Sequence, residues 1–283
     1  MNNRRLKWTA FTAVSIACAY IAYLFFPTAF PIVSVDISMT REVAIEKALE
    51  LSQEHGWGPA IPQRDAASFG TNIRAKTFVE LEAGGVEAFA RLLKDPIFSP
   101  YTWQVRLFSE GVINETTVHF RPDGRPYGFK EKIAEDEELS NVDPDTAQRA
   151  VEAAASAIWN IDLAGLELME SGQDEKPNGR IDHRFVYESS RDDLGDGRLQ
   201  VRTRVTGNRV SRIEPSIRVP ESFKRRHQEM RSANNSIRTL GQVGMFLLLI
   251  VSGVGLYHLS RRRQLVWRPA IIAAGLIAVC LLY

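Results

Sequence analysis

Acidic residues are missing from both ends of this 283-residue chain. No aspartate or glutamate precedes Asp36 or follows Glu229, so all 34 acidic residues lie in the middle. Residues 1–31 and 240–283 hold seven of the 35 lysines and arginines, which leaves residues 32–239 with 28 bases and a net charge of −6. This balance excludes a basic nucleic-acid-binding domain, and we expect no nucleic acid among the partners.

Cysteine is scarce, and several catalytic motifs are absent. Cys18 and Cys280 both lie in apolar stretches, which excludes a disulfide framework and a thiolate zinc site. The sequence contains no HExxH, no G-x-S-x-G and no phosphate-binding loop. Aromatic and aliphatic residues occur throughout the acidic middle, so we expect this part to fold.

Uncharged apolar runs predict three membrane spans. The run from Thr9 to Phe30 has 22 residues, or roughly 33 Å of helix, enough to cross a bilayer core of about 30 Å. It favours an uncleaved anchor over a cleaved signal peptide, because it is long and ends in a poor cleavage site. We place this first helix and its cytoplasmic tip at 1–31. Two further spans are expected at 240–259 and 265–283, joined by a loop at 260–264.

The basic residues near these spans predict their orientation. Four arginines on or beside the 260–264 loop and the basic start of the chain favour the cytoplasm for both. Residues 32–239 would then lie outside the cytoplasm. Five basic residues just before the second span favour the opposite orientation. We give them less weight, because long segments are translocated across the membrane largely regardless of their charge. The third span carries an alanine stripe and stops without a polar tail, so we expect further transmembrane helices beyond it.

The segment outside the membrane has the pattern of a tandem α+β repeat. In the first copy, Thr40 is a candidate N-cap and His55-Gly56 a candidate helix end. A strand at 77–81, a helix at 86–93, and strands at 102–108, 115–120 and 127–130 are expected after it. Pro122-Asp123-Gly124 marks the last turn.

The same order recurs after residue 140. Asp143-Pro144 opens a helix predicted at 147–159, and strands are expected at 182–188, 199–206 and 209–213, with a turn at Gly207-Asn208. We therefore predict two helix-plus-antiparallel-meander repeats, at 32–139 and 140–219. Leu51 and Ile158 are expected to be buried at equivalent places on the two helices.

Several short motifs resemble known bacterial families. The helix-then-meander unit with its Pro122-Asp123-Gly124 turn is similar to PepSY-like extracytoplasmic modules. The whole chain resembles the N-terminal part of CPBP (ABI, type II CAAX-processing-like) intramembrane endopeptidases. The motifs that carry this resemblance are Phe78-Val79-Glu80-Leu81, Tyr101-x-Trp103-x-Val105-Arg106-x-Phe108, Gly179-Arg180-x-Asp182-His183-x-Phe185 and Val219-Pro220-Glu221-x-Phe223. The resemblance implies a bacterial inner (plasma) membrane and, for the whole family protein, a zinc-dependent protease.

The catalytic residues of that family have no counterpart here. The family carries EExxxR on a membrane helix, whereas Glu137-Glu138 lies in a soluble acidic run and Val142 stands at the arginine position. His258 is alone at a membrane edge. We assign no catalytic, cofactor-binding or metal-binding residue to this chain, and we expect no cofactor in it. The resemblance implies zinc only for a protease core that this chain does not contain.

Three polar features have structural explanations that we prefer. His119 and the pair Asp182-His183 are the best candidates for a polar site, but a metal would need a third ligand, so we interpret them as hydrogen-bonded strand residues. The run from Glu135 to Glu138 is interpreted as a solvated linker. Asn114 and Asn234 each begin an N-glycosylation sequon. This short pattern often occurs by chance, so we assign it no function.

Residues 220–239 form a predicted helical stalk before the second span. Phe223, Met230 and Ile237 recur every seven residues, and five bases surround them. The stalk either connects the parts, transmits a signal as a rod, or contacts anionic lipid headgroups.

The sequence leaves two functions open. The first is a membrane-anchored sensing or binding region of a CPBP-type protease, itself not catalytic. Its partners would be the bilayer, a protease core with further transmembrane helices, and a peptide or protein ligand. The alternative is a PepSY-like envelope binding or inhibitor module with no protease connection.

Overall fold

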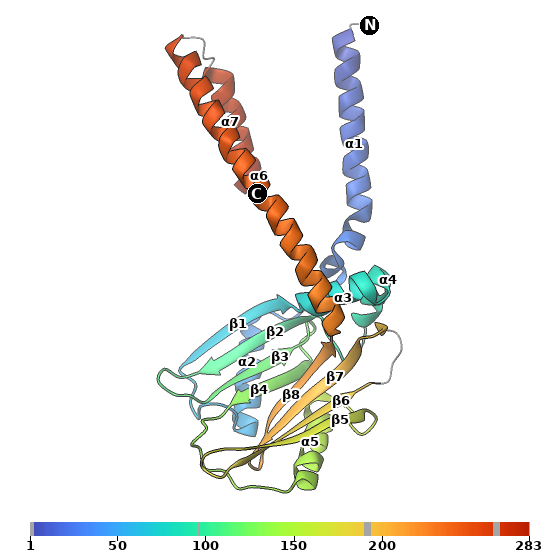
Figure 1. Ribbon diagram of the computed structural model, residues 1–283, viewed down its shortest axis with the longest axis vertical. Helices are drawn as coiled ribbons and strands as arrows, with labels where there is room; N and C mark the ends of the chain where they lie inside the picture. The colour runs from blue at the N-terminus through green and yellow to red at the C-terminus, as the bar shows by residue number, and fades with distance from the viewer. Residues whose placement is uncertain (1–2, 96, 190–193, 263–266, 283) are drawn as a thin grey trace. The chain divides into compact units, whose positions relative to one another are not determined.

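The computed structural model describes residues 3–95, 97–189, 194–262 and 267–282. The chain divides into two compact units, Met1–Pro220 and Glu221–Tyr283. Figure 1 shows the elements in chain order.

The first unit is an α+β structure built on one sheet. Its helical elements are α1 (Asn3–Ala29), the 3₁₀ helix η1 (Pro31–Ser34), α2 (Arg41–His55), α3 (Ile73–Glu82), α4 (Gly85–Leu92) and α5 (Pro144–Trp159). Its strands are β1 (Arg64–Thr71), β2 (Tyr101–Phe108), β3 (Glu115–Phe120), β4 (Pro126–Lys132), β5 (Glu167–Glu175), β6 (Ile181–Glu188), β7 (Arg198–Thr206) and β8 (Arg209–Arg218).

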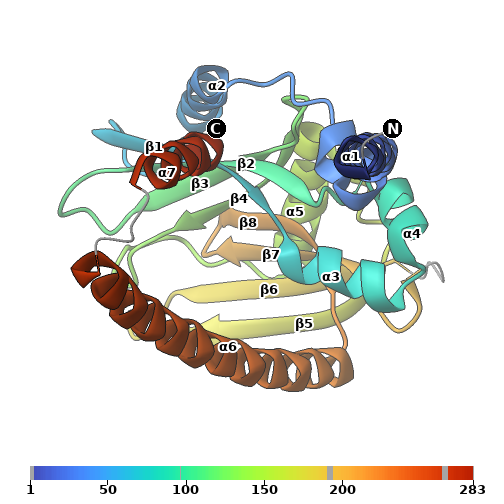
Figure 2. The same cartoon turned by 90° about the horizontal axis from the view of Figure 1, so that it is seen from above.

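The strand order reveals an internal repetition. The eight strands follow the order β1-β2-β3-β4-β8-β7-β6-β5, and every neighbouring pair is antiparallel. A helix followed by a four-stranded meander therefore occurs twice, as α2 with β1–β4 and as α5 with β5–β8. The last strands of the two meanders pair with each other, Phe129 opposite Ile213 and Lys130 opposite Arg212. The two predicted repeats thus share one continuous sheet (Figures 1 and 2).

The ends of the two repeat helices follow the sequence signals. The Thr40 hydroxyl accepts from the Val43 N–H at 3.4 Å, and Gly56 ends α2 with φ +66°. Asp143 caps α5 by accepting from the Thr146 N–H at 2.9 Å. Both helix starts are confirmed, because each side chain satisfies one of the amide groups that a helix leaves without a partner.

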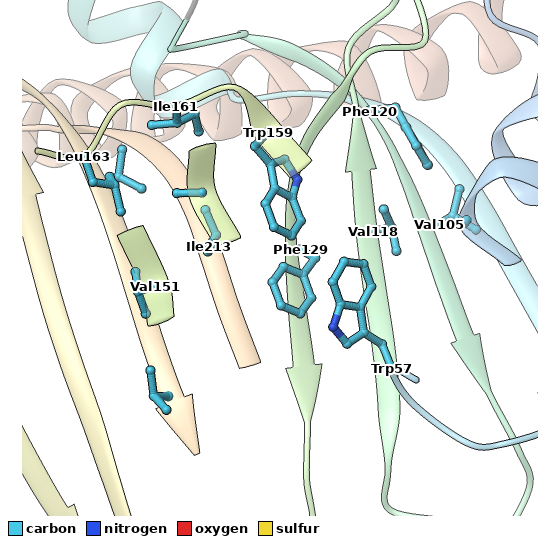
Figure 3. Packing of buried hydrophobic residues seen from close by; sticks show 14 of the residues in the cluster. Trp57, Val105, Val118, Phe120, Phe129, Val151, Trp159, Ile161, Leu163 and Ile213 are labelled. Atoms are coloured by element: carbon cyan, nitrogen blue, oxygen red, sulfur yellow. The ribbon is translucent and has the colours of Figure 1, made fainter. Parts of the chain in front are cut away.

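A single hydrophobic core joins both repeats (Figure 3). It includes Ala44 and Ala48 from α2, Val151 and Ala155 from α5, and inward-facing residues of both meanders. At its centre the rings of Phe129, Trp57 and Trp159 pack against one another: the Phe129 centroid lies 4.1 Å from Trp57 and 4.9 Å from Trp159, and the two tryptophan centroids are 5.6 Å apart. Small residues on both helices let them lie close to the sheet.

Several sequence predictions for this unit need correction. Residues 77–81, predicted as a strand, belong to helix α3, which Asn72 caps by accepting from the Ala75 N–H at 3.1 Å. The edge strands β1 and β5 were not predicted at all. Leu51 and Ile158 are half-buried at the margin of the core, because Ser52 and Trp159 occupy the buried positions beside them.

The second unit contains two helices, α6 (Glu221–Arg261) and α7 (Trp267–Leu282). The 41 residues of α6 form one helix without a break, as predicted for the stalk and second span. Within α6 the Phe223 and His227 rings stack, with centroids 5.5 Å apart.

The structure supports fewer membrane spans than the three expected. Over the described residues, only α6 is both long and apolar enough to cross a bilayer. The apolar part of α1, Phe11–Pro27, and the 16 residues of α7 are shorter than that requirement. Most of the predicted 260–264 loop lies outside the described residues. Among the described residues, the structure therefore supports one of the three expected spans as a candidate.

Candidate functional site

The sheet has one face packed against α2 and α5 and an opposite face that is strongly polar. Side chains alternate between the two faces along each strand. On β7, for example, Leu199, Val201 and Val205 are buried toward the helices, whereas Arg202 and Arg204 lie on the opposite side. We call this opposite side the polar face.

A line of positive charges crosses the polar face at right angles to the strands. Arg184 on β6 pairs with Arg204 on β7, Arg204 pairs with Arg212 on β8, and Arg212 pairs with Lys130 on β4. These four residues, the cation row, therefore occupy directly opposite positions on four neighbouring strands. Like charges placed directly opposite in a sheet repel one another, so this arrangement costs stability.

Neighbouring acids neutralise the cation row only in part. Arg212 Nε lies 3.7 Å from Glu214 Oε2. Burial, together with the charge of Arg204, lowers the pKa of Arg212 despite the attraction of Glu214. In the part of the chain that the structure describes, Lys130, Arg184 and Arg204 form no ion pair.

Asp174, on the neighbouring strand β5, is a second acid that interacts electrostatically with the cation row. Its pKa is lowered mainly by the hydrogen bond from Lys176, with smaller contributions from Arg184 and Arg204. The carboxylate of Asp174 accepts from Lys176 Nζ at 2.9 Å. Asp174 is therefore already engaged by a lysine outside the cation row.

A large hollow borders one half of the cation row. It has a volume of about 710 Å³, and Lys130, Arg204 and Thr117 are among its lining residues. Most of its acids are paired with arginine or lysine: Glu115 with Arg106, Glu131 with Arg209, Glu135 with Lys176 and Asp182 with Arg180. The lining cations Lys130, Lys132 and Arg204 have no such partner among the described residues, so the hollow favours a negatively charged group.

The sequence-predicted residue His119 lines a second, smaller polar hollow. This hollow has a volume of about 170 Å³ and also includes Gln104, Gly128 and Glu214. His119 is opposite Gly128 in the register, and Gly128 lies between it and β8. Burial lowers the pKa of His119, while the carboxylate of Glu214 acts in the opposite direction. His119 is therefore kept mainly neutral near pH 7.

The structure does not bring His119 together with Asp182 and His183. Strands β3 and β6 are separated by β4, β8 and β7, a distance of about 19 Å at the usual strand spacing. His183 lies on the helix-covered side, where its Nε2 is 2.9 Å from the Val142 carbonyl oxygen. Asp182 forms a buried ion pair with Arg180 at 3.1 Å. The three residues do not form one site.

The acidic run at 135–138 is tied to the sheet by Arg180. Its guanidinium donates to the carbonyl oxygens of Ala134 and Glu137 at 2.8 and 2.9 Å. The Asn114 side chain accepts from the Ala134 N–H at 2.8 Å.

Within the described residues, no three histidine, cysteine, aspartate or glutamate side chains are grouped so that they could hold a metal ion.

Sequence reasoning missed the cation row, although part of its signal was visible. The alternation of 199–206 places Arg202 and Arg204 on one side of their strand. The alignment with Lys130 depends on the pairing of β4 with β8, which joins residues about 80 positions apart in the chain. No local pattern reports such a pairing.

Comparison with protein-family models, curated proteins and solved structures found no match. The family resemblance suggested by the sequence motifs therefore remains a hypothesis.

Proposed function

We propose that this chain is a membrane-anchored binding module that presents the polar face of its sheet to a peptide or protein ligand outside the cytoplasm. The observation that carries this proposal is the cation row, in which Lys130 and Arg184 are exposed and Arg204 and Arg212 half-buried. Its members repel one another, and the hydrophobic core does not require them. A surface of this kind suits a ligand-binding role better than a purely structural one.

Membrane attachment is supported by α6, whose second half is apolar and long enough to cross a bilayer. We propose α1 and α7 as additional membrane helices, because both are predominantly apolar and have basic residues near one end. In this arrangement the N-terminus lies in the cytoplasm of a bacterial cell and residues 32–239 lie outside it.

The resemblance to CPBP endopeptidases adds a partner to this proposal. The module would sense or bind a ligand for an intramembrane protease core, to which this chain contributes no catalytic residue. A stand-alone PepSY-like module with no protease is the alternative. The two differ in whether the chain co-purifies with a zinc-containing membrane protease.

Site-specific photo-crosslinking in intact cells tests the binding role. A crosslinking amino acid at Thr117, beside the cation row, should form adducts with a peptide or protein. The matched control is Ala153, which is exposed on α5 on the other side of the sheet. Adducts at residue 117 that are absent at 153 are expected. Equal adducts at both positions, or none at either, would contradict a ligand on the polar face.

A further inference from the structure

We infer that the ligand of the polar face is an acidic peptide segment whose carboxylates bind along the cation row. This inference rests on the proposed function and specifies the chemistry of its ligand. Four basic residues occupy directly opposite positions on four strands, which gives a row about 14 Å long at the usual strand spacing. An extended peptide covers that length with about four residues.

The row offers the correct donor chemistry for carboxylates. Three of its four members are arginines, whose planar guanidinium groups can donate two parallel hydrogen bonds to one carboxylate. Bound carboxylates would also relieve the repulsion between opposite cations. The unbound protein therefore stores an unfavourable interaction that an acidic ligand removes.

The surroundings of the row favour a peptide over other anions. Of the described residues that line the large hollow, none is aromatic, whereas single-stranded nucleic acids bind by stacking bases on aromatic rings. Acids lie beside the row as well, including Asp136 in the hollow and Asp174 on β5. They repel a surface of uniform negative charge, such as an anionic bilayer, but can accept hydrogen bonds from the backbone N–H groups of a peptide.

Binding of a fluorescent oligoglutamate peptide to the full chain in phosphatidylcholine nanodiscs tests the inference. The row variant is Arg184→Gln with Arg204→Gln. The control variant, Arg41→Gln with Arg74→Gln, removes the same charge from exposed positions on α2 and α3. We expect the row variant to weaken binding about tenfold or more and the control to remain within about twofold. An oligoglutamine peptide should not bind.

Thermal unfolding without peptide gives a second, independent readout. Removing two repelling cations should leave the melting temperature unchanged or raise it. A lower melting temperature in the row variant would show that the row is a structural element and would overturn the inference.

Two further arms distinguish other sources of negative charge. Inorganic phosphate, added at the same concentration of negative charge as the peptide, should compete only weakly with it, because one phosphate ion cannot span the cation row. Anionic phosphatidylglycerol in the nanodisc should not displace the peptide. Displacement by either, or equal binding to both variants, would overturn the acidic-peptide inference. Crosslinks at Thr117 without oligoglutamate binding would leave the proposed function standing with a ligand of different chemistry.

Discussion

Glu131 is an unusual residue, because its carboxylate is buried beneath the large hollow. Its Oε1 accepts from the Gly58 N–H at 2.6 Å and from Arg209 Nη2 at 2.9 Å, while its buried Oε2 has no hydrogen-bond partner among the described residues. Burial raises the pKa of Glu131 to about 7, although Gly58 and Arg209 act in the opposite direction. The loss of hydration therefore outweighs the ion pair.

This raised pKa predicts a pH-dependent stability. The folded pKa lies above the unfolded value, so folding favours the protonated form, and its benefit is lost as the pH rises from about 4.5 to about 7. Glu131→Gln should therefore gain stability relative to the wild type across this range, by up to about 3 kcal/mol. Chemical denaturation between pH 5 and 8 measures the difference. The prediction would be contradicted if the unfolding free energies of Glu131→Gln and the wild type changed in parallel with pH. Such parallel behaviour is expected for the exposed control Glu135→Gln.

Gly128 is required by the junction of the two meanders. A Cβ atom at this position would lie 2.5 Å from the Ile213 carbonyl oxygen and 3.1 Å from Pro215 Cδ. Gly128→Ala should therefore cost about 1–3 kcal/mol of unfolding free energy, in the range of overpacked cores. Gly70→Ala is the control, since among the described residues a Cβ there would come within 4 Å of the Gln104 side chain alone, at 3.9 Å. Equal stability of the two variants would show that the junction tolerates a side chain.

Some residue roles could be read from the sequence and others could not. Gly124 and Gly207 both lie in turns, as their motifs predict, and their φ angles are +84° and +58°. The placement of His119 and His183 on opposite faces of the sheet was not predicted, since both were considered as candidates for one polar site. Half-burial of Leu51 and Ile158 was not readable, since it depends on where each helix meets the sheet.

At the level of elements, helices with clear caps were predicted best. Thr40 and Asp143 mark the helix starts because their side chains satisfy local amide groups. Strand β5 was missed, since its residues are mostly exposed and polar and show little hydrophobic alternation. Strand β1 lies at the other edge of the sheet and contains small residues. Edge strands depend on their single neighbour more than on their own sequence.

The continuity of α6 is directly measurable. Arg225 and Thr239 are exposed and lie 14 residues apart in this helix, which corresponds to about 21 Å. Spin labels at these positions, in a chain with Cys18→Ala and Cys280→Ala, should give a narrow distance distribution near this value. A Gly-Gly insertion after Ser232 should broaden it, because each glycine costs a helix about 1 kcal/mol. A broad distribution without the insertion would show a flexible connection.

For the whole molecule, the sequence indicated the α+β class and the repetition but not the shared sheet. Each repeat was read as a separate region, and nothing local reveals that β4 pairs with β8. That pairing creates the common core and also aligns Lys130 with Arg212. The architecture and the candidate site therefore have the same origin in one long-range contact.

The central claim of this account is that the sheet is displayed outside the cytoplasm by a membrane-anchored chain. Ser140→Cys, in the exposed link between the repeats, tests it in a chain with Cys18→Ala and Cys280→Ala. A membrane-impermeant maleimide applied to intact spheroplasts should label residue 140, whereas Arg262→Cys, just after α6, should react only after the membrane is permeabilised. Labelling of residue 262 in intact spheroplasts, with residue 140 protected until permeabilisation, would contradict the account.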